Sequence, residues 1–467
     1  MNPQDRQTPW GRWWWRYFLG DFVGAALAWC ALFVFRKTVV EPRKFGAEVS
    51  LELDTNFWAA MVVVPLFWCG IHALMGMYVD IRRRHRALEI RQVVRASAGG
   101  GVLLFFLLLL DDVTRTHTDH YQVLFVWMMS HTVLVLGLRG WLTTQVVARV
   151  QSGEWAFNTL LVGEAKDTAA FRRELEETPG ARGWNVLDAM QERDINSDLR
   201  ALSNWLDDHS VDRAVIATPV SGHESLLGWI AVLEGRGVET LVVPGALDYM
   251  AGRVKSTNLF GIPLVNLSRN PMSHGVKALK RFLDLFLSLL ALLVLSPVLL
   301  LVALWVKSDS DGPVFYRQER LGLFGRPFHI IKFRTMVQNA EGQGPKLSSD
   351  ADPRITRVGK WLRKTRVDEL PQFWNVVKGE MSLVGPRPER AFFADQIVQH
   401  SPHFLRLQQV RPGITSWGQV KYGYAENVNE MRQRLRYDIM YLENASLLLD
   451  LKILLYTVRT VLRREGK

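Results

Sequence analysis

Four long apolar runs in the first third of the chain restrict its fold more than any other feature. They cover residues 17–40, 56–79, 92–110 and 121–147. Each is about long enough to cross a bilayer core of roughly 30 Å. Because lipid cannot satisfy backbone N–H and C=O groups, runs of this length predict membrane-spanning helices. The sequence therefore predicts a four-helix transmembrane domain over residues 1–150.

The first sixteen residues do not resemble a cleavable signal. They are polar and rich in tryptophan, and they lack the short basic tip that precedes the apolar core of a signal peptide. The run Trp13–Trp15 is typical of an aromatic anchor at the membrane interface.

Loop charge predicts the orientation of this domain, because cytoplasmic loops are enriched in Lys and Arg. Basic residues precede the first run, join the second to the third and follow the fourth: Arg6, Arg12, Arg16, Arg82, Arg83, Arg84, Arg86 and Arg149. The other two loops carry acids: Glu48, Glu52, Asp54, Asp111, Asp112 and Asp119. Both ends of the domain are therefore expected in the cytoplasm.

The whole chain carries a formal net charge of +11. That charge fits a protein that lies against anionic lipid and handles phosphates. Nucleic acid is the other common partner of a basic protein. No nucleic-acid-binding motif is recognisable here, so we do not expect nucleic acid as a partner. Cys30 and Cys69 both fall within predicted spans, so neither a disulfide framework nor a zinc site is expected.

Residues 157–267 consist of short β-branched runs that alternate with amphipathic segments. The runs NTLLVGE, VDRAVIAT and VETLVVPG are typical of strands, and residues 167–178, 198–209 and 223–236 are typical of helices. This alternation predicts a Rossmann-like, doubly wound parallel sheet in a domain over residues 151–270. Only Gly163 remains of a three-glycine phosphate turn after the first strand. We therefore expect a structural, dimerising or regulatory role, with ligand binding as the alternative.

An apolar stretch at residues 282–306 has the length of a fifth span but is interrupted by Ser296 and Pro297. Basic residues flank it on both sides: Lys277, Lys280, Arg281, Lys307, Arg317 and Arg320. Because basic flanks stay in the cytoplasm, this pattern predicts a re-entrant helix that bends at the proline and returns. A proline-kinked helix that crosses the membrane is the alternative. Asp284, one turn from Lys280 and Arg281, is predicted to form an ion pair on the helix face.

Asp368 and Glu369 form the centre of a segment, residues 359–388, in which charge and turn residues converge. An apolar run with Pro371 near its start and Gly379 at its end follows them, which predicts a helix capped by Asp368. An Asp at such a position is most often only a cap. As an ionised carboxylate it also suits a magnesium ligand or an anionic nucleophile.

Many basic side chains lie close to this pair in the sequence. They are Lys332 and Arg334 in the run HIIKFRTM, then Arg354, Arg357, Arg363, Lys364, Arg366 and Arg387. Arginine grips phosphate oxygens at two points, and a magnesium ion on the carboxylates would neutralise further negative charge. The combination predicts a polyanionic substrate, with a solvated basic face as the alternative.

The C-terminal part adds Arg411 and a turn at Pro412–Gly413. Residues 447–464 combine leucines with Lys452, Arg459, Arg463 and Arg464. This composition predicts an amphipathic helix on the membrane surface or, alternatively, an ordinary helix that faces the core.

Four segments of this part are familiar in their order and spacing: KFRTM, DPRITRVGKWLRKTRVDELPQFWNVVKGEMSLVGPRP, RPGITSWGQV and YDIMYLENASLLLDLKIL. They closely resemble the bacterial sugar transferases, which are polyprenyl-phosphate hexose-1-phosphate transferases of the monotopic phosphoglycosyl transferase type. The resemblance runs from about Lys277 to the C-terminus. The arrangement upstream is similar to the large members of the family, such as the undecaprenyl-phosphate galactose or glucose phosphotransferases.

The resemblance implies a monotopic catalytic domain over residues 271–467, with a re-entrant helix broken at Ser296 and Pro297. It implies an enzyme of the bacterial inner membrane whose catalytic domain lies on the cytoplasmic face, and a homodimer. The implied reaction moves hexose 1-phosphate from a UDP-hexose to undecaprenyl phosphate and releases UMP. It would be the first membrane step of surface or exopolysaccharide synthesis.

The resemblance also implies roles for single residues. Asp368 would be the nucleophile on the sugar-linked phosphorus and would hold Mg²⁺ with Glu369. The implied substrate-binding residues are Lys332, Arg334, Arg363, Arg411 and Arg387, the last of which lies between Pro386 and Pro388.

Two other functions compete with this interpretation. A membrane-tethered nucleotide-sugar dehydratase or epimerase would require a glycine-rich cofactor turn and a Tyr-x-x-x-Lys pair, and we find neither. In a non-enzymatic scaffold of an envelope export complex, the acids and arginines would only cap helices and coat the membrane face.

Overall fold

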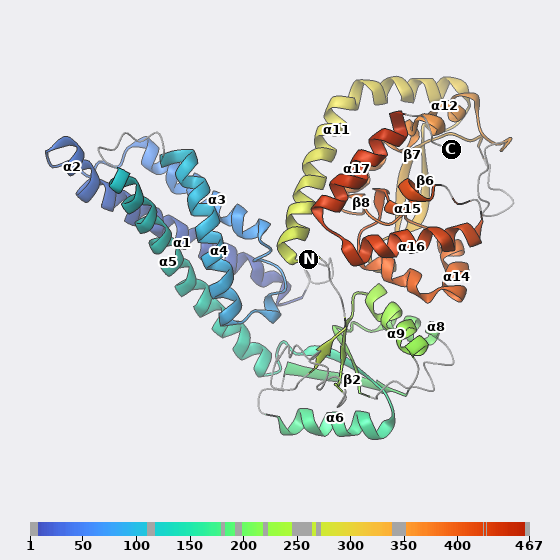
Figure 1. Cartoon of the computed structure of the whole chain (residues 1–467), viewed down its shortest axis with the longest axis horizontal. Helices are drawn as coiled ribbons and strands as arrows, with labels where there is room; N and C mark the ends of the chain where they lie inside the picture. Colours follow the sequence, from blue (N-terminus) through green and yellow to red (C-terminus); the bar gives the residue numbers. More distant parts are fainter. Residues whose placement is uncertain are drawn as a thin grey trace. The chain divides into compact units, whose positions relative to one another are not determined.

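The computed structural model describes residues 8–109, 117–178, 183–191, 199–217, 223–244, 264–267, 272–338, 352–423, 425 and 427–462. It divides into two compact units (Figure 1). The first contains Met1–Ala156 and Ser273–Leu279, and the second contains Phe157–Met272 and Lys280–Lys467. The α/β part and the C-terminal part therefore share one compact unit.

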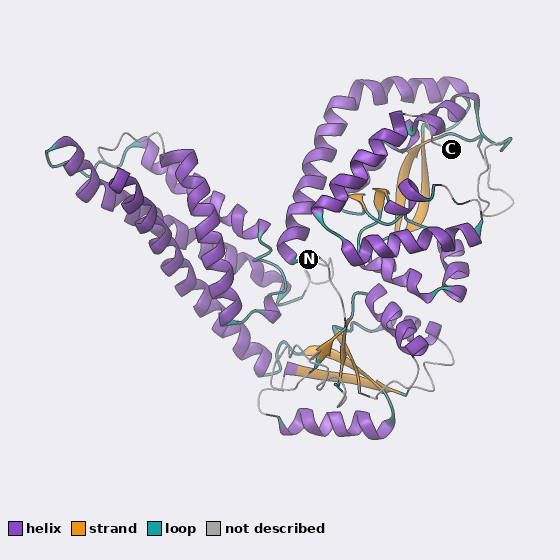
Figure 2. Cartoon of the chain, in the orientation of Figure 1, coloured by secondary structure: helices purple, strands orange, loops and turns teal. Residues whose placement is uncertain are grey.

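The first unit is built from long helices (Figure 2). They are η2 (Gly11–Trp13), α1 (Trp14–Phe35), η3 (Arg36–Val40), α2 (Glu41–Phe45), α3 (Thr55–Leu74), η4 (Ile81–Arg83), α4 (Arg86–Leu104), η5 (Phe105–Leu109) and α5 (His117–Gln151). Four helical segments here are long and apolar enough to cross a membrane, and they coincide with the four predicted runs. Residue 110, the predicted end of the third run, lies outside the described residues.

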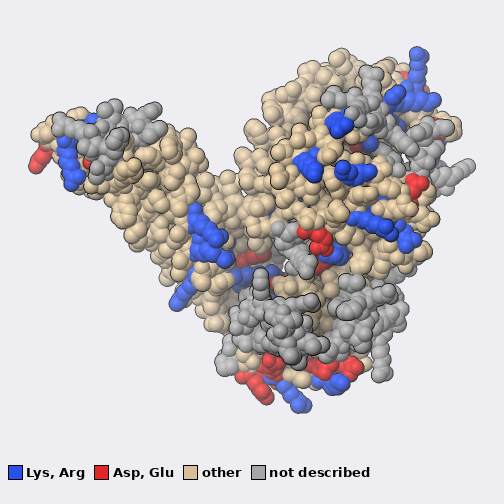
Figure 3. Space-filling view, viewed as in Figure 1, with Lys and Arg blue, Asp and Glu red and all other residues tan. Residues whose placement is uncertain are grey.

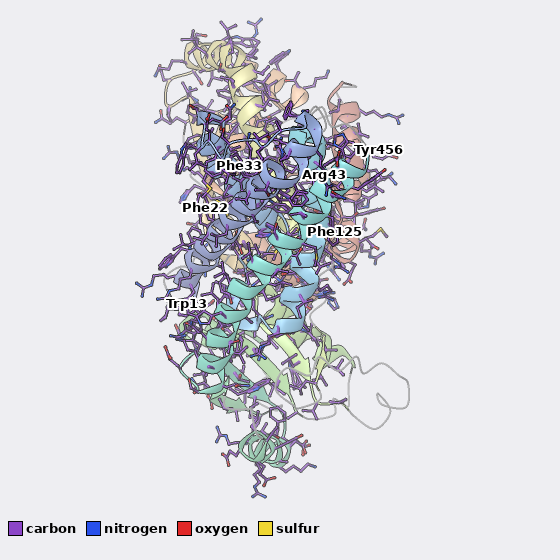
Figure 4. The ribbon with its side chains drawn as sticks, turned by 90° about the vertical axis from the view of Figure 1, so that its left-hand side faces the viewer. Trp13, Phe22, Phe33, Arg43, Phe125 and Tyr456 are labelled. Atoms are coloured by element: carbon purple, nitrogen blue, oxygen red, sulfur yellow. The ribbon has the colours of Figure 1, made fainter. Side chains whose placement is uncertain are left out.

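The surface of this unit fits a lipid environment. Figure 3 shows a band without Lys, Arg, Asp or Glu along the middle of the bundle, with charged side chains toward its ends. Figure 4 places Trp13 and Arg43 toward opposite ends of the bundle, with Phe22 and Phe33 between them. Outward-facing Leu27 is about half exposed, so apolar side chains cover the outside as well as the inside.

A polar cluster lies inside the same bundle. Arg139 of α5 is fully buried and donates to Asp21 of α1 (2.6 Å) and to Glu89 of α4 (2.7 Å). His72 and Tyr78 also bond to Asp21, at 2.9 and 2.7 Å. The cluster therefore links helices α1, α3, α4 and α5 through hydrogen-bonded charges.

The α/β part is a five-stranded sheet with helices on both faces. Its elements are β1 (Phe157–Val162), α6 (Ala165–Glu177), β2 (Trp184–Met190), α8 (Leu199–Asp208), β3 (Arg213–Ile216), α9 (His223–Gly235), β4 (Glu239–Val242) and β5 (Val265–Asn266). The strand order is β2-β1-β3-β4-β5; the first four strands are parallel, and β5 is antiparallel to β4. The predicted doubly wound sheet is confirmed.

Alternate residues of the central strands face opposite cores. Leu160 of β1 and Ile216 of β3 pack with α8 and α9, whereas Leu161 and Val215 pack with α6. Both faces are covered, which explains the continuous apolar runs from which these strands were predicted. The prediction missed β2, an edge strand whose side chains are mostly exposed and which lacks a β-branched run.

The C-terminal part contains two small sheets held by helices. Its elements are α11 (His274–Asp309), β6 (Phe315–Leu321), η7 (Leu323–Gly325), β7 (Pro327–Phe333), α12 (Arg357–Thr365), η8 (Val367–Glu369), α13 (Gln372–Lys378), β8 (Ser382–Val384), α14 (Ala391–His400), η9 (Pro402–Gln409), β9 (Gly413–Thr415), α15 (Trp417–Lys421), α16 (Val428–Asn444) and α17 (Leu447–Leu462). Strands β6 and β7 form an antiparallel hairpin, and β8 pairs with β9 in parallel.

Helix α11 is long, apolar and bent (Figure 1). It contains Pro297, and Ser296 Oγ donates to the carbonyl of Leu293 at 2.8 Å. A proline removes one backbone hydrogen bond from a helix and crowds the preceding turn, which accounts for a bend there.

Of the two predicted helix-face partners of Asp284, Lys280 is wrong, whereas the charge of Arg281 does interact with Asp284. Lys280 instead pairs with Asp450 of α17 at 2.5 Å. Asp284 accepts hydrogen bonds from Ser382 Oγ at 2.7 Å and from the amide of Leu383 at 3.2 Å. Tertiary partners satisfy both side chains better than the exposed helix-face pair that the spacing suggested.

Helix α17 has apolar side chains on more than one face. Ile453 is fully buried, whereas Leu448, Leu451, Leu455 and Val458 are more than half exposed at helical spacing. The helix therefore faces the core and still presents an apolar stripe outward, which combines the two alternatives of the sequence analysis. Arg463 and Arg464 lie outside the described residues.

Candidate active site

Asp368 and Glu369 lie in a short turn between two helices. Thr356 caps α12 by accepting from the amide of Gly359, and α12 ends at Arg366, which has a left-handed φ of 61°. The 3₁₀ turn η8 follows, and α13 begins only after Pro371 and ends at Gly379. The predicted cap is therefore wrong: Pro371 is the N-cap residue of α13, and Asp368 makes no capping hydrogen bond.

The two carboxylates are buried among cations. Asp368 and Glu369 are each 7% exposed. Lys332 Nζ lies 2.7 Å from Glu369 Oε1, and one guanidinium nitrogen each of Arg366 and Arg387 lies 3.8 Å from a Glu369 oxygen. Arg363 adds a further positive charge near Asp368. The structure thus brings together the acid pair and four of the basic residues noted in the sequence.

The two acids differ in their electrostatic environment. Burial, and then the charge of Glu369, raise the pKa of Asp368 above its ordinary range, against the opposing effect of Lys332. Burial also acts to raise the pKa of Glu369, but Lys332, Arg387 and Arg366 outweigh it and leave that pKa lowered. No described residue donates a hydrogen bond to the Asp368 carboxylate, whereas Lys332 donates to Glu369. Glu369 is therefore held as an anion by Lys332, whereas the carboxylate of Asp368 can still bind a ligand.

Lys332 is held in place from α13. The fully buried side chain of Asn375 accepts from the amide of Ile331 at 3.1 Å and donates to the carbonyl of His329 at 2.8 Å. These bonds fix strand β7 against α13 and set Lys332 opposite Glu369. Sequence reasoning missed Asn375, because a polar residue in an amphipathic helix gives no sign that it is buried.

Arg387 lies in the loop Pro386–Pro388, which follows β8. The chain is tightly packed here: a Cβ on Gly385 would lie 2.3 Å from the carbonyl oxygen of Arg411, so only glycine fits. Arg320 donates to the carbonyl of Pro388 at 3.2 Å. The next residue, Glu389, pairs with Arg434 of α16. Sequence reasoning missed these two supporting arginines, although the position of Glu389 directly after the loop was a signal.

Two predicted substrate-binding residues lie elsewhere. Arg334 donates to the carbonyls of Ser310 (2.6 Å) and Val306 (3.4 Å), at the end of α11. Arg411 donates to the carbonyl of Gly379 at 2.9 Å, and burial, followed by the nearby charge of Arg281, lowers its pKa. No described contact joins either residue to the acid pair.

A shallow pocket lies beside the Pro386–Pro388 loop. The hairpin residues Leu321 and Gly322 line one part of it, the loop with Glu389 lines another, and η9 lines a third through Phe404, Leu407 and Gln408. Arg387 is common to this pocket and to the surroundings of Glu369. It therefore connects the acid pair with a concave surface.

The side chains at the acid pair fit a magnesium ion. Among the described residues no group of three or more His, Cys, Asp and Glu side chains could hold a metal by itself. Mg²⁺, however, is usually held by one or two carboxylates and completed by water and substrate phosphates. Asp368 without a hydrogen-bonded donor, beside Glu369, supplies that donor set.

Comparisons with known proteins place this geometry in a family. The model of the bacterial sugar transferase family matches residues 275–464, which contain the acid pair, the Pro386–Pro388 loop and Arg411. The UDP-N-acetylgalactosamine-undecaprenyl-phosphate N-acetylgalactosaminephosphotransferase of Aeromonas hydrophila is 43% identical over 219 residues, covering 47% of this chain and 51% of that protein.

Two similar proteins are UDP-glucose:undecaprenyl-phosphate glucose-1-phosphate transferases. The one from Klebsiella pneumoniae is 34% identical over 251 residues, covering 53% of this chain and 54% of that protein. The one from Caulobacter vibrioides is 44% identical over 189 residues, covering 40% of this chain and 71% of that protein. The chain spans about half the length of the first two of these three relatives. Since the matched region contains the whole acid-pair site and covers most of the shorter relative, the chain belongs to the bacterial sugar transferase family.

Proposed function

We propose that this protein transfers a hexose 1-phosphate from a UDP-hexose to a polyprenyl phosphate such as undecaprenyl phosphate and releases UMP. The observation that carries the proposal is the buried pair Asp368–Glu369 among Lys332, Arg363, Arg366 and Arg387. The names of the relatives supply the substrate classes, since they pair UDP-sugars with undecaprenyl phosphate. We infer that the step begins the assembly of a surface or exopolysaccharide.

The charges at the site suit a diphosphate. Four cations around two carboxylates leave a local positive excess among these six side chains. Arginine forks bind phosphate oxygens at two points, and they stabilise the charge that develops during phosphoryl transfer. Arg387 borders both the acid pair and the pocket, so it can meet a diphosphate whose nucleotide extends toward the concave surface.

Asp368 is proposed as the nucleophile. Its carboxylate oxygen forms a bond to the sugar-linked phosphorus, the bond from that phosphorus to the bridging oxygen breaks, and UMP leaves. An oxygen of the polyprenyl phosphate then attacks the same phosphorus and Asp368 is released. Such a route divides one difficult displacement into two easier ones. Glu369, held ionised by Lys332, keeps this cation in position for the phosphates.

Asp368 and Glu369 would hold Mg²⁺ if it binds. The ion would neutralise phosphate oxygens of the substrate. Burial raises the pKa of Asp368 and so favours its neutral form. Cations near its carboxylate oppose this effect and favour the ionised form that attacks.

Helix α11 is proposed to enter the membrane and return. Its first half bonds to β8 and α17 through Asp284 and Lys280, and its second half packs Val302 and Val306 against Phe333. Both halves therefore touch the same folded part, which supports a helix that enters the membrane and returns. Between them, Leu293 and Val294 are 74% and 65% exposed, as expected for the tip inside lipid.

We propose the bacterial inner membrane as the location, with the acid pair on the cytoplasmic side. The positive cluster at Arg82–Arg86 supports this orientation. Arg43 and Lys44 lie at the other end of the bundle, so the orientation depends on the larger cluster. Cysteine labels at Ser273 and Ser308 should both react only from the cytoplasmic side, and labelling of Ser308 from the periplasm would disprove the re-entrant helix.

Release of UMP tests the function directly. Detergent-solubilised protein is mixed with Mg²⁺, undecaprenyl phosphate and a panel of UDP-sugars, and UMP is measured. We expect release with one or a few UDP-hexoses. A well-folded protein that released no UMP from any of them would favour the scaffold, and conversion of the sugar without UMP release would favour a dehydratase or epimerase.

A further inference from the structure

Helix η9 belongs to two hydrophobic cores at once. Phe404 and Leu407 are buried in the core formed with α14 and α16. Leu405, between them, packs against the core of the α/β sheet, beside Trp229 and Leu233. Consecutive residues of one short helix therefore point into two different parts of the compact unit.

A buried ion pair fixes this contact. Glu234 of α9 is 3% exposed and accepts from Arg406 of η9 at 2.8 Å. Arg406 also donates to Glu443 of α16 at 2.7 Å, so one guanidinium joins three elements. The next residue, Gly235, permits the close approach, since a Cβ there would lie 2.6 Å from the carbonyl oxygen of Leu405.

A second contact reaches the tip of the β6–β7 hairpin. The ring of Phe324 lies where a Cβ on Gly237 would be, at 2.5 Å, and Gly237 has a φ of +78°. Arg236 donates to the carbonyl of Phe324 at 3.4 Å and is itself held by Ser203 and Asp207 of α8. The end of α9 and the turn after it thus touch both η7 and η9.

Of these two contacted segments, η9 lines the pocket beside Arg387, and η7 adjoins the hairpin residues that line it. Gly322 precedes η7 and lines the pocket, as do Leu407 and Gln408 of η9. The third wall is the Pro386–Glu389 loop. Two walls of the pocket are therefore supported from the α/β part of the chain, none of whose described residues lines the pocket itself.

We propose that the α/β domain positions the segments around Arg387 that meet the donor, with Glu234 and Arg406 as the positioning residues that set the affinity of the protein for the UDP part of the donor. This inference rests on the proposed function for the identity of the ligand. It assigns to the α/β domain a role in donor binding that does not require a ligand of its own. The acid pair is held by other contacts, chiefly Asn375 and Lys332, so the chemical step should not depend on the ion pair.

The test compares three variants of the full-length protein. Glu234→Gln and Arg406→Gln remove the charge on either side, and Gly235→Ala pushes on η9 without changing charge. Each should raise the KM for the UDP-sugar and weaken the binding of UMP about three- to tenfold, with kcat little changed, because couplings between sites are of this size. The double variant Glu234→Gln/Arg406→Gln should be no worse than Arg406→Gln alone, since Arg406→Gln already removes the contact with Glu234.

Glu239→Gln is the matched control. It breaks the ion pair between Arg213 of β3 and Glu239 of β4, which is also 2.8 Å long, and neither residue lines the pocket. It should lower thermal stability without moving the KM. If the three variants lowered stability but left KM and UMP affinity at the values of the wild type and of the control, the inference would be wrong.

Two further outcomes separate the inference from the proposed function. A wild-type protein that releases no UMP from any donor but binds UMP disproves the function, and the UMP affinities of the variants still decide the inference. A wild-type protein that does not bind UMP overturns the inference itself.

Discussion

Two pairs of buried carboxylates in this chain have opposite surroundings. Inside the helix bundle, Arg139 donates hydrogen bonds to both Asp21 and Glu89. A nitrogen of Arg84 donates a further hydrogen bond to a Glu89 oxygen at 2.9 Å. In the C-terminal part, Glu369 accepts from Lys332, whereas Asp368 accepts no hydrogen bond from any described residue. The first pair lies on α1 and α4 and has hydrogen-bonded partners on α3 and α5, whereas the second pair is surrounded by more positive than negative charge.

The difference shows how buried charge can serve stability or chemistry. A matched cluster has little capacity for a further ligand, and its removal leaves an uncompensated charge in an apolar interior. An unmatched cluster keeps uncompensated charge buried, which destabilises the fold until an anion binds. A phosphate group is an anion that can neutralise such a cluster. Burial alone therefore does not identify a catalytic group; the balance of hydrogen bonds and charges around it does.

The largest expected effect is on the chemistry of the unmatched pair. Asp368→Asn should lower kcat by about 10⁴-fold or more, because removal of a nucleophile eliminates the covalent route. With UDP-sugar alone, the wild-type protein should gain the mass of a phosphosugar and release a stoichiometric burst of UMP, and the variant should do neither. Intact-protein mass spectrometry after mixing with donor and Mg²⁺ measures this.

Glu369→Gln is the control for that experiment. It should retain some labelling if Glu369 only positions the metal or Lys332. Direct attack by the lipid phosphate gives another pattern, with no labelled protein and no UMP before acceptor is added. That pattern would remove Asp368 from the role of nucleophile.

The matched cluster should affect stability and spare catalysis. Arg139→Met leaves Asp21 and Glu89 without their shared donor and should lower the free energy of unfolding by about 3–5 kcal/mol. The transfer rate per folded molecule should stay close to that of the wild type. Thermal unfolding in detergent and kcat corrected for active fraction measure the two effects, and a large loss of kcat in folded protein would contradict the comparison.

Within the unmatched pair, the two acids should have opposite effects on stability without divalent cations. The pKa of Asp368 is raised, so its stabilising contribution is present at low pH and lost as pH rises through the folded-state value. The pKa of Glu369 is lowered, so its contribution is present at neutral pH and lost as pH falls. Near pH 7, Asp368→Asn should therefore stabilise the protein and Glu369→Gln should destabilise it, each by about 1 kcal/mol.

Unfolding curves recorded in EDTA at pH 7 and at pH 4 provide the measurement. Both differences from the wild type should shrink at the lower pH. If both variants changed the free energy of unfolding in the same direction at pH 7, the pKa values of the two acids would not be shifted in opposite directions.

The smallest expected effect is the change in kcat when the whole helix bundle, with its matched cluster, is deleted. A protein that begins at Phe157 lacks the helix bundle but keeps the whole second unit, together with Ser273–Leu279 of the first unit. It should retain most of its kcat in detergent, because every described contact of the acid pair lies within that unit. Folded protein without transfer would show that the bundle contributes to the site.

Several features of the fold could be read directly from local patterns. The apolar runs of the bundle have the length of membrane-spanning helices. The strands β1, β3 and β4 have the β-branched, apolar composition of strands that are buried on both faces. Gly379 ends α13 in the left-handed conformation, as predicted, because only glycine adopts it without strain. Edge strand β2 escaped prediction, since half-exposed strands carry a weaker signal.

The sequence by itself determined the chemistry of the site: an acid pair, its arginines and the loop Pro386–Pro388 are all visible as residue types in fixed order. Only the tertiary structure decided which of them meet. It joins Lys332 and Arg387 to Glu369, while Arg334 and Arg411 bond to distant carbonyls. The physical reason is that a local pattern records a residue's charge and its neighbours in the chain, whereas the partner of a buried charge is set by the packing of segments far apart in sequence.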